Sequence, residues 1–143
     1  MTGTYTVNKQ FCFEMAHLLD GHDGKCKNLH GHGYVLQVEV TAPLCREGVK
    51  EGMVIDFGDL KTIVEEKIIS HLDHAFIYDQ RSTRESKIAE VLISLNSKVY
   101  AVNFRSTAEQ LAQHIFELLK QTGLPVSCIR LWESSDSSCE YRL

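Results

Sequence analysis

Two segments near the N-terminus alternate between apolar and polar residues, and this alternation constrains the fold more than any other feature. They span residues 5–19 and about 31–42, and a polar loop, Leu19–Lys25, connects them. Because successive side chains of a strand point to opposite faces, each segment gathers its apolar residues on one face. These faces carry Phe11, Phe13, Met15 and His17 in the first segment, and Tyr34, Leu36, Val38 and Val40 in the second. We therefore predict an antiparallel hairpin that is covered on one side.

The rest of the chain predicts two main helices and further short elements. Residues 57–71 carry an apolar stripe at helical spacing and follow Asp56, a suitable N-cap. Ser106–Glu109 is typical of a capping box that opens a second long helix, and Gly123 ends it. We further expect a short helix over 85–95 and strands over 98–102, 126–133 and 138–143. This order predicts an α+β fold with an antiparallel sheet backed by helices on one face.

Composition places the chain among soluble single-domain proteins. Its 143 residues are 43% hydrophobic and 24% charged, which suits one domain spanning 1–143. A net charge of −4 without lysine or arginine runs disfavours nucleic-acid and membrane partners. The N-terminus lacks a signal-peptide pattern, and no apolar run approaches the ~20 residues of a membrane helix. The five cysteines are irregularly spaced, so we expect reduced thiols and a cytoplasmic location.

Three histidines are expected to meet at one end of the hairpin. His30 and His32 are two residues apart, so both point to the apolar face of the second strand, and His17 ends the apolar face of the first. Three neutral imidazoles suit Zn²⁺, and three protein ligands leave a fourth position open, as in catalytic zinc sites. A single histidine at a strand end is more often a hydrogen-bonded structural residue, and this alternative applies most to His17. We interpret three further histidines as structural: His22, His71 and His114.

Other polar residues have both a chemical and a structural interpretation. Cys26 precedes His30 by four residues and can be a metal ligand or a reactive thiol beside a cationic site. Asp73 can orient the imidazole of His74 for proton transfer, or the two can be a solvated pair at a helix end. Glu133 falls on the apolar face of its strand, where a carboxylate needs a partner. That partner can be a ligand with N–H donors, or a group of the protein itself.

Together these residues resemble the family of 6-pyruvoyltetrahydropterin synthases and 6-carboxytetrahydropterin synthases. The most specific part is Cys26–His32, a Cys-x-x-x-His-Gly-His sequence, followed downstream by Leu72-Asp-His74. The matching segments occur in family order and span nearly the whole chain: Phe13–His17, Cys26–His32, Val54–Phe57, Leu72–His74, Ser106–Glu109 and Trp132-Glu133.

The resemblance implies a tunnelling fold. In this fold a four-stranded antiparallel sheet carries two helices on one face. Three subunits close a twelve-stranded barrel, and two trimers stack into a homohexamer with active sites between subunits. Closure hides the sheet edges that a monomer leaves open.

Residue roles follow from the resemblance at the matching positions. It implies that His17, His30 and His32 bind zinc and that Cys26 is a general acid or base. Asp73 and His74 complete a proton relay. The carboxylate of Glu133 anchors the pterin ring, and Thr107 adds contacts to that ring.

The implied substrate is 7,8-dihydroneopterin triphosphate, with no nicotinamide or flavin cofactor. Short chains with this cysteine–histidine spacing resemble the 6-carboxytetrahydropterin synthases of queuosine biosynthesis, which release acetaldehyde and triphosphate. One alternative is the pyruvoyl enzyme of tetrahydrobiopterin synthesis, which eliminates triphosphate and keeps the three-carbon chain. Another is a non-catalytic tunnelling-fold protein with a structural zinc.

The chain departs from the family pattern in three places. Ala75–Asp79 replaces the usual continuation after Leu-Asp-His, and Ser106 and Gln110 replace a common proline and asparagine. An insert at about 80–102 is longer than in compact members. We expect it either to reshape the pocket entrance or to decorate the barrel.

Overall fold

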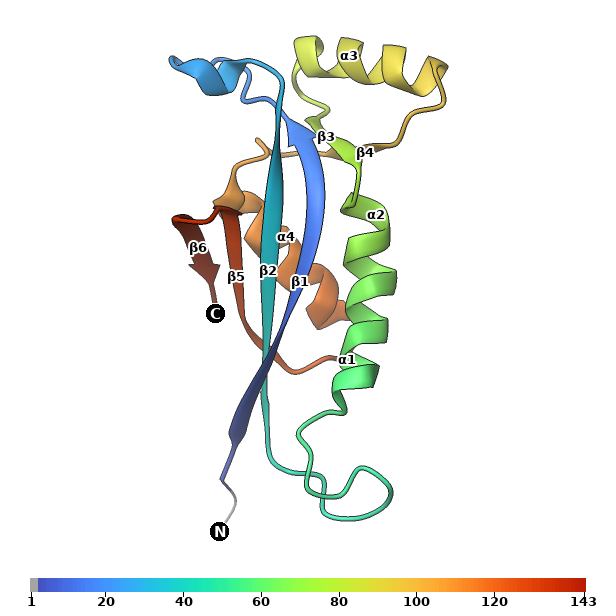
Figure 1. Ribbon diagram of the computed structural model, residues 1–143, viewed down its shortest axis with the longest axis vertical. Helices are drawn as coiled ribbons and strands as arrows, with labels where there is room; N and C mark the ends of the chain where they lie inside the picture. The colour runs from blue at the N-terminus through green and yellow to red at the C-terminus, as the bar shows by residue number, and fades with distance from the viewer. Residues whose placement is uncertain (1–2) are drawn as a thin grey trace.

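The computed structural model describes residues 3–143 and has the predicted α+β architecture (Figure 1). Residues 1 and 2 of the predicted domain lie outside the described residues. The strands are β1 (Tyr5–His17), β2 (His30–Ala42), β3 (Ala75–Asp79), β4 (Val99–Val102), β5 (Val126–Ser134) and β6 (Ser137–Tyr141). The helical segments are η1 (Lys25–Lys27), α1 (Phe57–Val64), η2 (Glu65–Ile69), α2 (Ser70–Leu72), α3 (Thr83–Ser94) and α4 (Ala108–Gln121).

The strands form one mixed sheet in the order β4-β3-β1-β2-β5-β6. β1, β2, β5 and β6 are antiparallel neighbours, as the four-stranded prediction requires. The predicted strand count was nevertheless wrong, because β3 pairs in parallel with both β1 and β4. The sheet therefore has six strands, and its extra pair continues from β1 along the edge opposite β6.

β3 has no alternating pattern because it is covered on both sides. Ala75, Phe76 and Ile77 are all buried, and so is Asp79. A short continuous apolar run is typical of a buried parallel strand and cannot be recognised by period-two alternation.

The register of the β1–β2 hairpin positions the histidines. His17 pairs with His30 and Met15 pairs with His32, so all three imidazoles share the end of one face. Phe13 and Tyr34, one step further along, stack with ring centroids 5.0 Å apart. The predicted apolar faces are confirmed, since Phe13, Met15 and Tyr34 are at most 3% exposed.

Two helices cover this apolar face. The predicted helix over 57–71 is observed as α1, η2 and α2, which follow without a break and include a π-helical turn over Glu65–Ile69. α4 contacts this long helix, and both contribute to the same buried cluster as the hairpin. The main helical members of the cluster are Leu60, Val64, Ile68, Leu111, Ala112, Ile115 and Leu119. The N-cap of α4 is Thr107, whose Oγ1 accepts the N–H of Gln110 at 3.3 Å.

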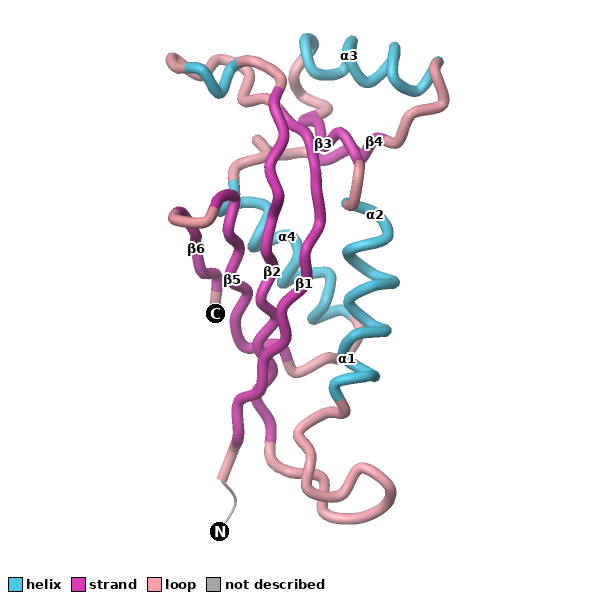
Figure 2. The backbone as a smooth tube through the Cα atoms, in the orientation of Figure 1, coloured by secondary structure: helices cyan, strands magenta, loops and turns pink. Residues whose placement is uncertain are grey.

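The predicted insert forms a separate layer near the loop end of the hairpin. α3 packs on β3 and β4, away from the other two helices (Figure 2). Ile88 and Leu92 of α3 contact a small buried cluster formed by Leu18, Phe76 and Ala89. The insert thus extends the sheet and covers its end.

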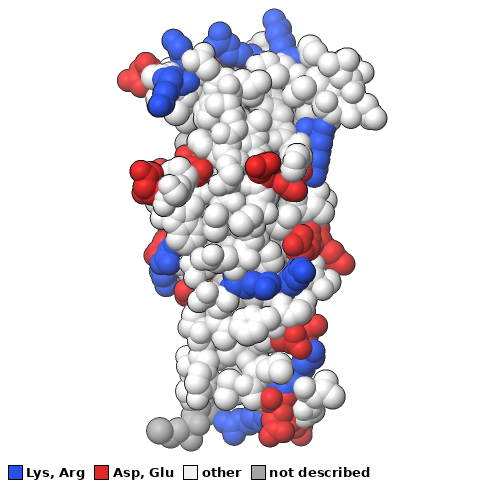
Figure 3. Space-filling view, in the orientation of Figure 1, with Lys and Arg blue, Asp and Glu red and all other residues white. Residues whose placement is uncertain are grey.

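Acidic and basic side chains are interspersed on the face that Figure 3 shows. Several basic groups lie at the end that carries the β1–β2 loop and α3. Within residues 3–143, no helix combines the length and apolar character needed to cross a membrane.

Candidate metal and pterin site

His17, His30 and His32 form a compact group that can hold a metal ion. One ligand nitrogen from each lies within 4.8 Å of the other two. The ring centroids are 4.7 to 5.1 Å apart, and the rings are steeply inclined to one another. Across residues 3–143, this is the one histidine, cysteine and carboxylate group of that kind, and Cys26 is not a member. The three histidines predicted from strand parity are therefore brought together.

Backbone carbonyls fix the orientation of two of these rings. The Nδ1 of His17 lies 2.9 Å from the carbonyl oxygen of Ser106, and the Nδ1 of His30 lies 2.7 Å from that of Asn28. A carbonyl only accepts, so each Nδ1 carries the proton and donates. Each Nε2 is then left with its lone pair, as a metal ligand requires.

Burial keeps His17 neutral, and one nitrogen of the group lacks a hydrogen-bond partner among the described residues. The pKa of His17 is lowered to about 4, mainly by desolvation and to a lesser extent by the other two histidines, against the raising effect of its hydrogen bond to Ser106. His17 is thus neutral near pH 7, the form that binds metals. The Nε2 of His30 is buried without a hydrogen-bond partner among the described residues. A cation between the three rings would satisfy it, so these residues fit a zinc ion.

Glu133 lies at the rim of this group. Its Oε1 is 4.0 Å from the Nε2 of His17, and its side chain is 29% exposed. The carboxylate therefore reaches both the histidines and solvent, as the parity of its strand predicts. Tyr34, which sequence reasoning assigned only to the core, has a buried hydroxyl without a partner among the described residues. Burial raises the pKa of Tyr34, and the negative charge of Glu133 raises it further.

Cys26 lies in the loop that joins the two strands carrying the three histidines. It is partly buried within η1, between the exposed Lys25 and Lys27. Its carbonyl accepts the N–H of Leu19 at 2.9 Å, which ties η1 to the residues that follow His17. The loop therefore holds the thiol at the same end of the hairpin as the three imidazoles.

Asp73 and His74 form the predicted pair. The Nδ1 of His74 lies 3.0 Å from Oδ1 of Asp73, and the same oxygen accepts the backbone N–H of Glu14 at 2.9 Å. The Glu14 amide is the main cause of the lowered pKa of Asp73, with smaller contributions from His74 and Lys98. The carboxylate is therefore ionised near neutral pH and holds the imidazole.

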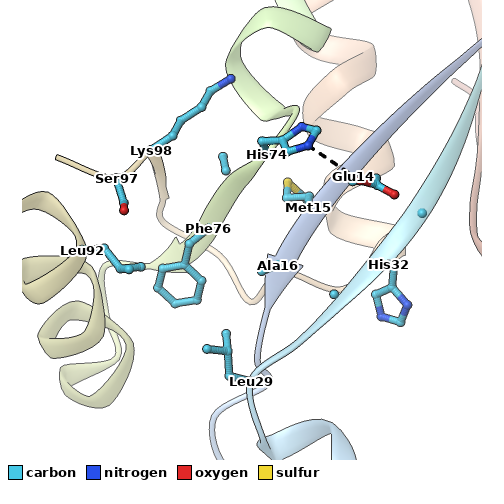
Figure 4. Close-up of a pocket in the computed structure, with 13 residues that line it drawn as sticks. Glu14, Met15, Ala16, Leu29, His32, His74, Phe76, Leu92, Ser97 and Lys98 are labelled. Carbon is cyan, nitrogen blue, oxygen red and sulfur yellow. Dashed lines mark ion pairs between the residues drawn. The ribbon is translucent and has the colours of Figure 1, made fainter. Parts of the chain in front are cut away.

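The pair does not face the histidine group of its own chain. Along β1, Met15 and His17 point into the core, whereas Glu14 and Ala16 point to the opposite face. His74 meets the side chain of Glu14, with Nε2 3.7 Å from Oε2, so it lies on that opposite face (Figure 4). It lines a cleft of about 610 Å³ with Glu14, Phe76, Leu92 and Lys98.

Sequence reasoning missed the contacts that support these residues. Ser106 was noted as the start of a capping box and as the replacement of a proline. Its hydroxyl lies 3.1 Å from Nδ1 of His17, in addition to its carbonyl contact. The contact spans 89 positions along the chain, so no local pattern reports it. Thr107 caps α4 through its hydroxyl and is partly buried beside Ser106.

The fold is that of the tunnelling-fold class, and comparisons with known proteins show that the chain belongs among the pterin synthases of this class. The family model described as 6-pyruvoyl tetrahydropterin synthase matches residues 6–143, so the chain belongs to this family. The family predicted from the cysteine and histidine motifs is therefore confirmed.

Two relatives of similar length carry the carboxypterin name. A protein of Haemophilus influenzae named 6-carboxy-5,6,7,8-tetrahydropterin synthase is 57% identical over 139 residues, covering 96% of this chain and 99% of the relative. A protein of the same name from Synechocystis is 32% identical, covering 96% of this chain and 92% of its own. The structure of the Caenorhabditis elegans 6-pyruvoyl tetrahydropterin synthase matches the fold with a TM-score of 0.72 at 23% identity, covering 99% and 96% of the two chains.

Proposed function

We propose that this protein converts 7,8-dihydroneopterin triphosphate and one water molecule to 6-carboxy-5,6,7,8-tetrahydropterin, acetaldehyde and triphosphate, a step of queuosine biosynthesis. The 57% identical relative that bears the name of this activity supports the choice of product. The observation that carries the proposal is the group of three histidines, with two Nδ1 atoms committed to carbonyls and the ligand atoms within 4.8 Å.

We infer that His17, His30 and His32 hold Zn²⁺ through their remaining nitrogens. Bound there, zinc would supply Lewis acidity toward hydroxyl oxygens of the substrate side chain. Three protein ligands leave a position for substrate, as in catalytic zinc sites. The chain's own contribution to this part of the site is orientation, since the Ser106 and Asn28 carbonyls hold two of the rings.

We assign acid–base chemistry to Cys26, Asp73 and His74. The thiolate of Cys26 removes a carbon-bound proton of the substrate side chain, and the imidazole of His74 returns a proton. Asp73 keeps the Nδ1–H tautomer of His74 through their 3.0 Å contact, so Nε2 is the atom that exchanges the proton. No external oxidant is needed, because oxidation of the side chain balances reduction of the ring.

This assignment requires more than one subunit. His74 faces away from the histidine group of its own chain, so in our proposal it serves the group of a neighbouring chain. Three chains closing a barrel, and two such trimers forming a homohexamer, would bring the two faces together.

Substrate binding is assigned to the remaining site residues. The carboxylate of Glu133 accepts the amino and ring N–H groups of the pterin, and Thr107 contacts the ring beside it. The exposed Lys25 and Lys27 lie in the hairpin loop and provide positive charge for the triphosphate.

Product analysis tests the proposal. Zinc-loaded protein is incubated with 7,8-dihydroneopterin triphosphate without oxygen, and products are identified by mass spectrometry. We expect the carboxypterin together with acetaldehyde. A pyruvoylpterin without acetaldehyde would instead assign the chain to the tetrahydrobiopterin branch. Absence of any conversion by zinc-loaded protein would favour a non-catalytic protein with a structural zinc.

A further inference from the structure

Lys98 makes two short hydrogen bonds that the reaction scheme above does not use. Its Nζ lies 2.7 Å from the carbonyl oxygen of Ser70 and 2.6 Å from that of Asp73. Both carbonyls belong to the end of the long helix, where the last carbonyls lack helical partners and the helix dipole favours a cation.

The Ser70 carbonyl is free because His74 leaves the helix. In a continued helix the N–H of His74 would bond to Ser70, but here it donates to the carbonyl of Glu14 at 2.6 Å. The last helical bond runs from the N–H of Asp73 to the carbonyl of Ile69. Lys98 therefore takes the place of the next amide donor.

His74 adopts a backbone conformation that needs such support. Its φ is +65°, in the left-handed region that side chains other than glycine seldom occupy. Lys98 binds the carbonyl of the Asp73–His74 peptide, and Glu14 binds the amide of the same peptide. The peptide unit is thus held at both ends, which fixes where the imidazole begins.

The turn between α3 and β4 places the ammonium group of Lys98 beside this peptide. α3 ends at a turn in which Asn96 has φ +60° and the N–H of Ser97 donates to the carbonyl of Leu92. The chain then reverses into β4, and the carbonyl of Lys98 accepts the N–H of Phe76, two residues beyond His74. Lys98 and His74 line the same cleft (Figure 4).

We propose that Lys98 is a positioning residue for the Asp73–His74 pair, and that the insert contributes to the active site by supplying it. The proposal rests on the proposed function, since it concerns the geometry of the proton-transfer pair. The ammonium group of Lys98 acts in two ways. It binds the peptide that carries His74, and it places a positive charge near the Asp73 carboxylate.

Kinetics of three variants test this role. We expect Lys98→Met, which keeps the aliphatic stem, to lower kcat about tenfold or more while KM and zinc content stay close to wild type. Lys98→Arg keeps the charge and the donors, so we expect it to restore most of the activity. Lys87→Met is the matched control, because Lys87 belongs to the same insert and its side chain makes no hydrogen bond or ion pair within residues 3–143. We expect it to leave kcat unchanged.

A double variant separates positioning from general stabilisation. If Lys98 acts through His74, then Lys98→Met combined with His74→Ala is no slower than His74→Ala alone. Multiplicative loss in the double variant, or unchanged kcat in folded Lys98→Met, would overturn the proposal. If Lys98→Met folds poorly, the imidazole ¹⁵N chemical shifts of His74 are compared between Lys98→Arg and wild type instead. We expect His74 to have the same Nδ1–H tautomer in both proteins.

The same series distinguishes the two levels of failure. A wild-type protein that does not convert the pterin triphosphate contradicts the proposed function. A wild-type protein that is active, with an equally active Lys98→Met variant, contradicts only the role of Lys98.

Discussion

Glu133 is the residue whose position is hardest to explain without a ligand. It shares its strand face with Ile129 and Leu131, which are fully buried, yet its carboxylate has no arginine or lysine partner within residues 3–143. A carboxylate beside the neutral imidazole of His17 and an apolar wall is stabilised by N–H donors, which a pterin ring presents.

Removing this carboxylate should weaken ligand binding and leave the metal in place. We expect Glu133→Ala to raise the dissociation constant of the pterin by about 10- to 100-fold, the value of one or two charge-assisted hydrogen bonds. The dissociation constant of Glu133→Gln, which keeps the shape and one acceptor, should lie between those of the wild type and Glu133→Ala. Pterin fluorescence titration measures the affinity and elemental analysis the zinc. An unchanged affinity would remove Glu133 from the site.

Strand parity was sufficient to predict that the three histidines meet, but not the contacts that hold them in place. His17, His30 and His32 share a face because side chains alternate along neighbouring residues, and such local information is present in the sequence. The contact of His17 with Ser106 joins residues on different elements, and that of Lys98 with Asp73 joins the start of β4 to the end of α2. Such contacts depend on how elements pack, so no spacing in the sequence could report them.

At the scale of elements, the junction between β3 and α3 depends on one buried carboxylate. Asp79 is 6% exposed and accepts hydrogen bonds from the side chain and backbone of Arg81, which hold its pKa below the ordinary 3.8. Glu85 accepts the N–H of Asp79. Asp20 and Arg105 line the same pocket as these two carboxylates. These bonds anchor the start of the insert.

Asp79→Asn should destabilise the protein in a pH-dependent way. A lowered folded-state pKa contributes stability above the unfolded pKa, and that stability is lost as pH falls through the folded value. We therefore expect the free energy of unfolding of the variant to be about 1 kcal/mol lower than that of the wild type at pH 7. This difference should decrease below about pH 4. Burial raises the pKa of Glu85, which acts with the opposite sign but is present in both proteins.

Urea unfolding at several pH values measures this difference. If the difference in unfolding free energy stays constant down to about pH 2.5, Asp79 does not contribute to stability through its ionised form.

Elements with one exposed face were predicted well, and the fully covered strand was not. The hairpin and both long helices follow from apolar positions at periods of two and 3.6 residues. β3 lies between β1 and β4 and is buried on both faces, so its sequence carries no alternation. The strand expected over 98–102 is observed as β4, whereas β3 and its parallel pairing with β1 and β4 were missed.

At the scale of the whole molecule, the two halves of the proposed chemistry lie on opposite faces of the sheet. The three histidines point into the core side of the hairpin, and His74 contacts Glu14 on the other side. If both serve one substrate, each site draws on two chains.

Mixing inactive subunits tests this arrangement. We expect Cys26→Ala and His74→Ala each to keep only a low, measurable residual activity alone. Co-assembled in equal amounts, they should regain about a quarter of wild-type activity, because one site in four receives both intact residues. The masses of the assemblies, measured by sedimentation, should be six times the 16.2 kDa chain. Mixtures that stay at the residual activity despite exchange of subunits would require both residues to come from one chain.

The central claim is that the three imidazoles bind the metal and the thiol of Cys26 acts as acid or base. One variant tests this claim most directly. Zinc content and turnover are measured on the same preparation of Cys26→Ala, with His30→Ala as the comparison. The account predicts about one zinc per subunit with turnover lost in Cys26→Ala, and loss of both in His30→Ala. Loss of zinc from Cys26→Ala would make the thiol a fourth ligand and the site structural, which would contradict the account.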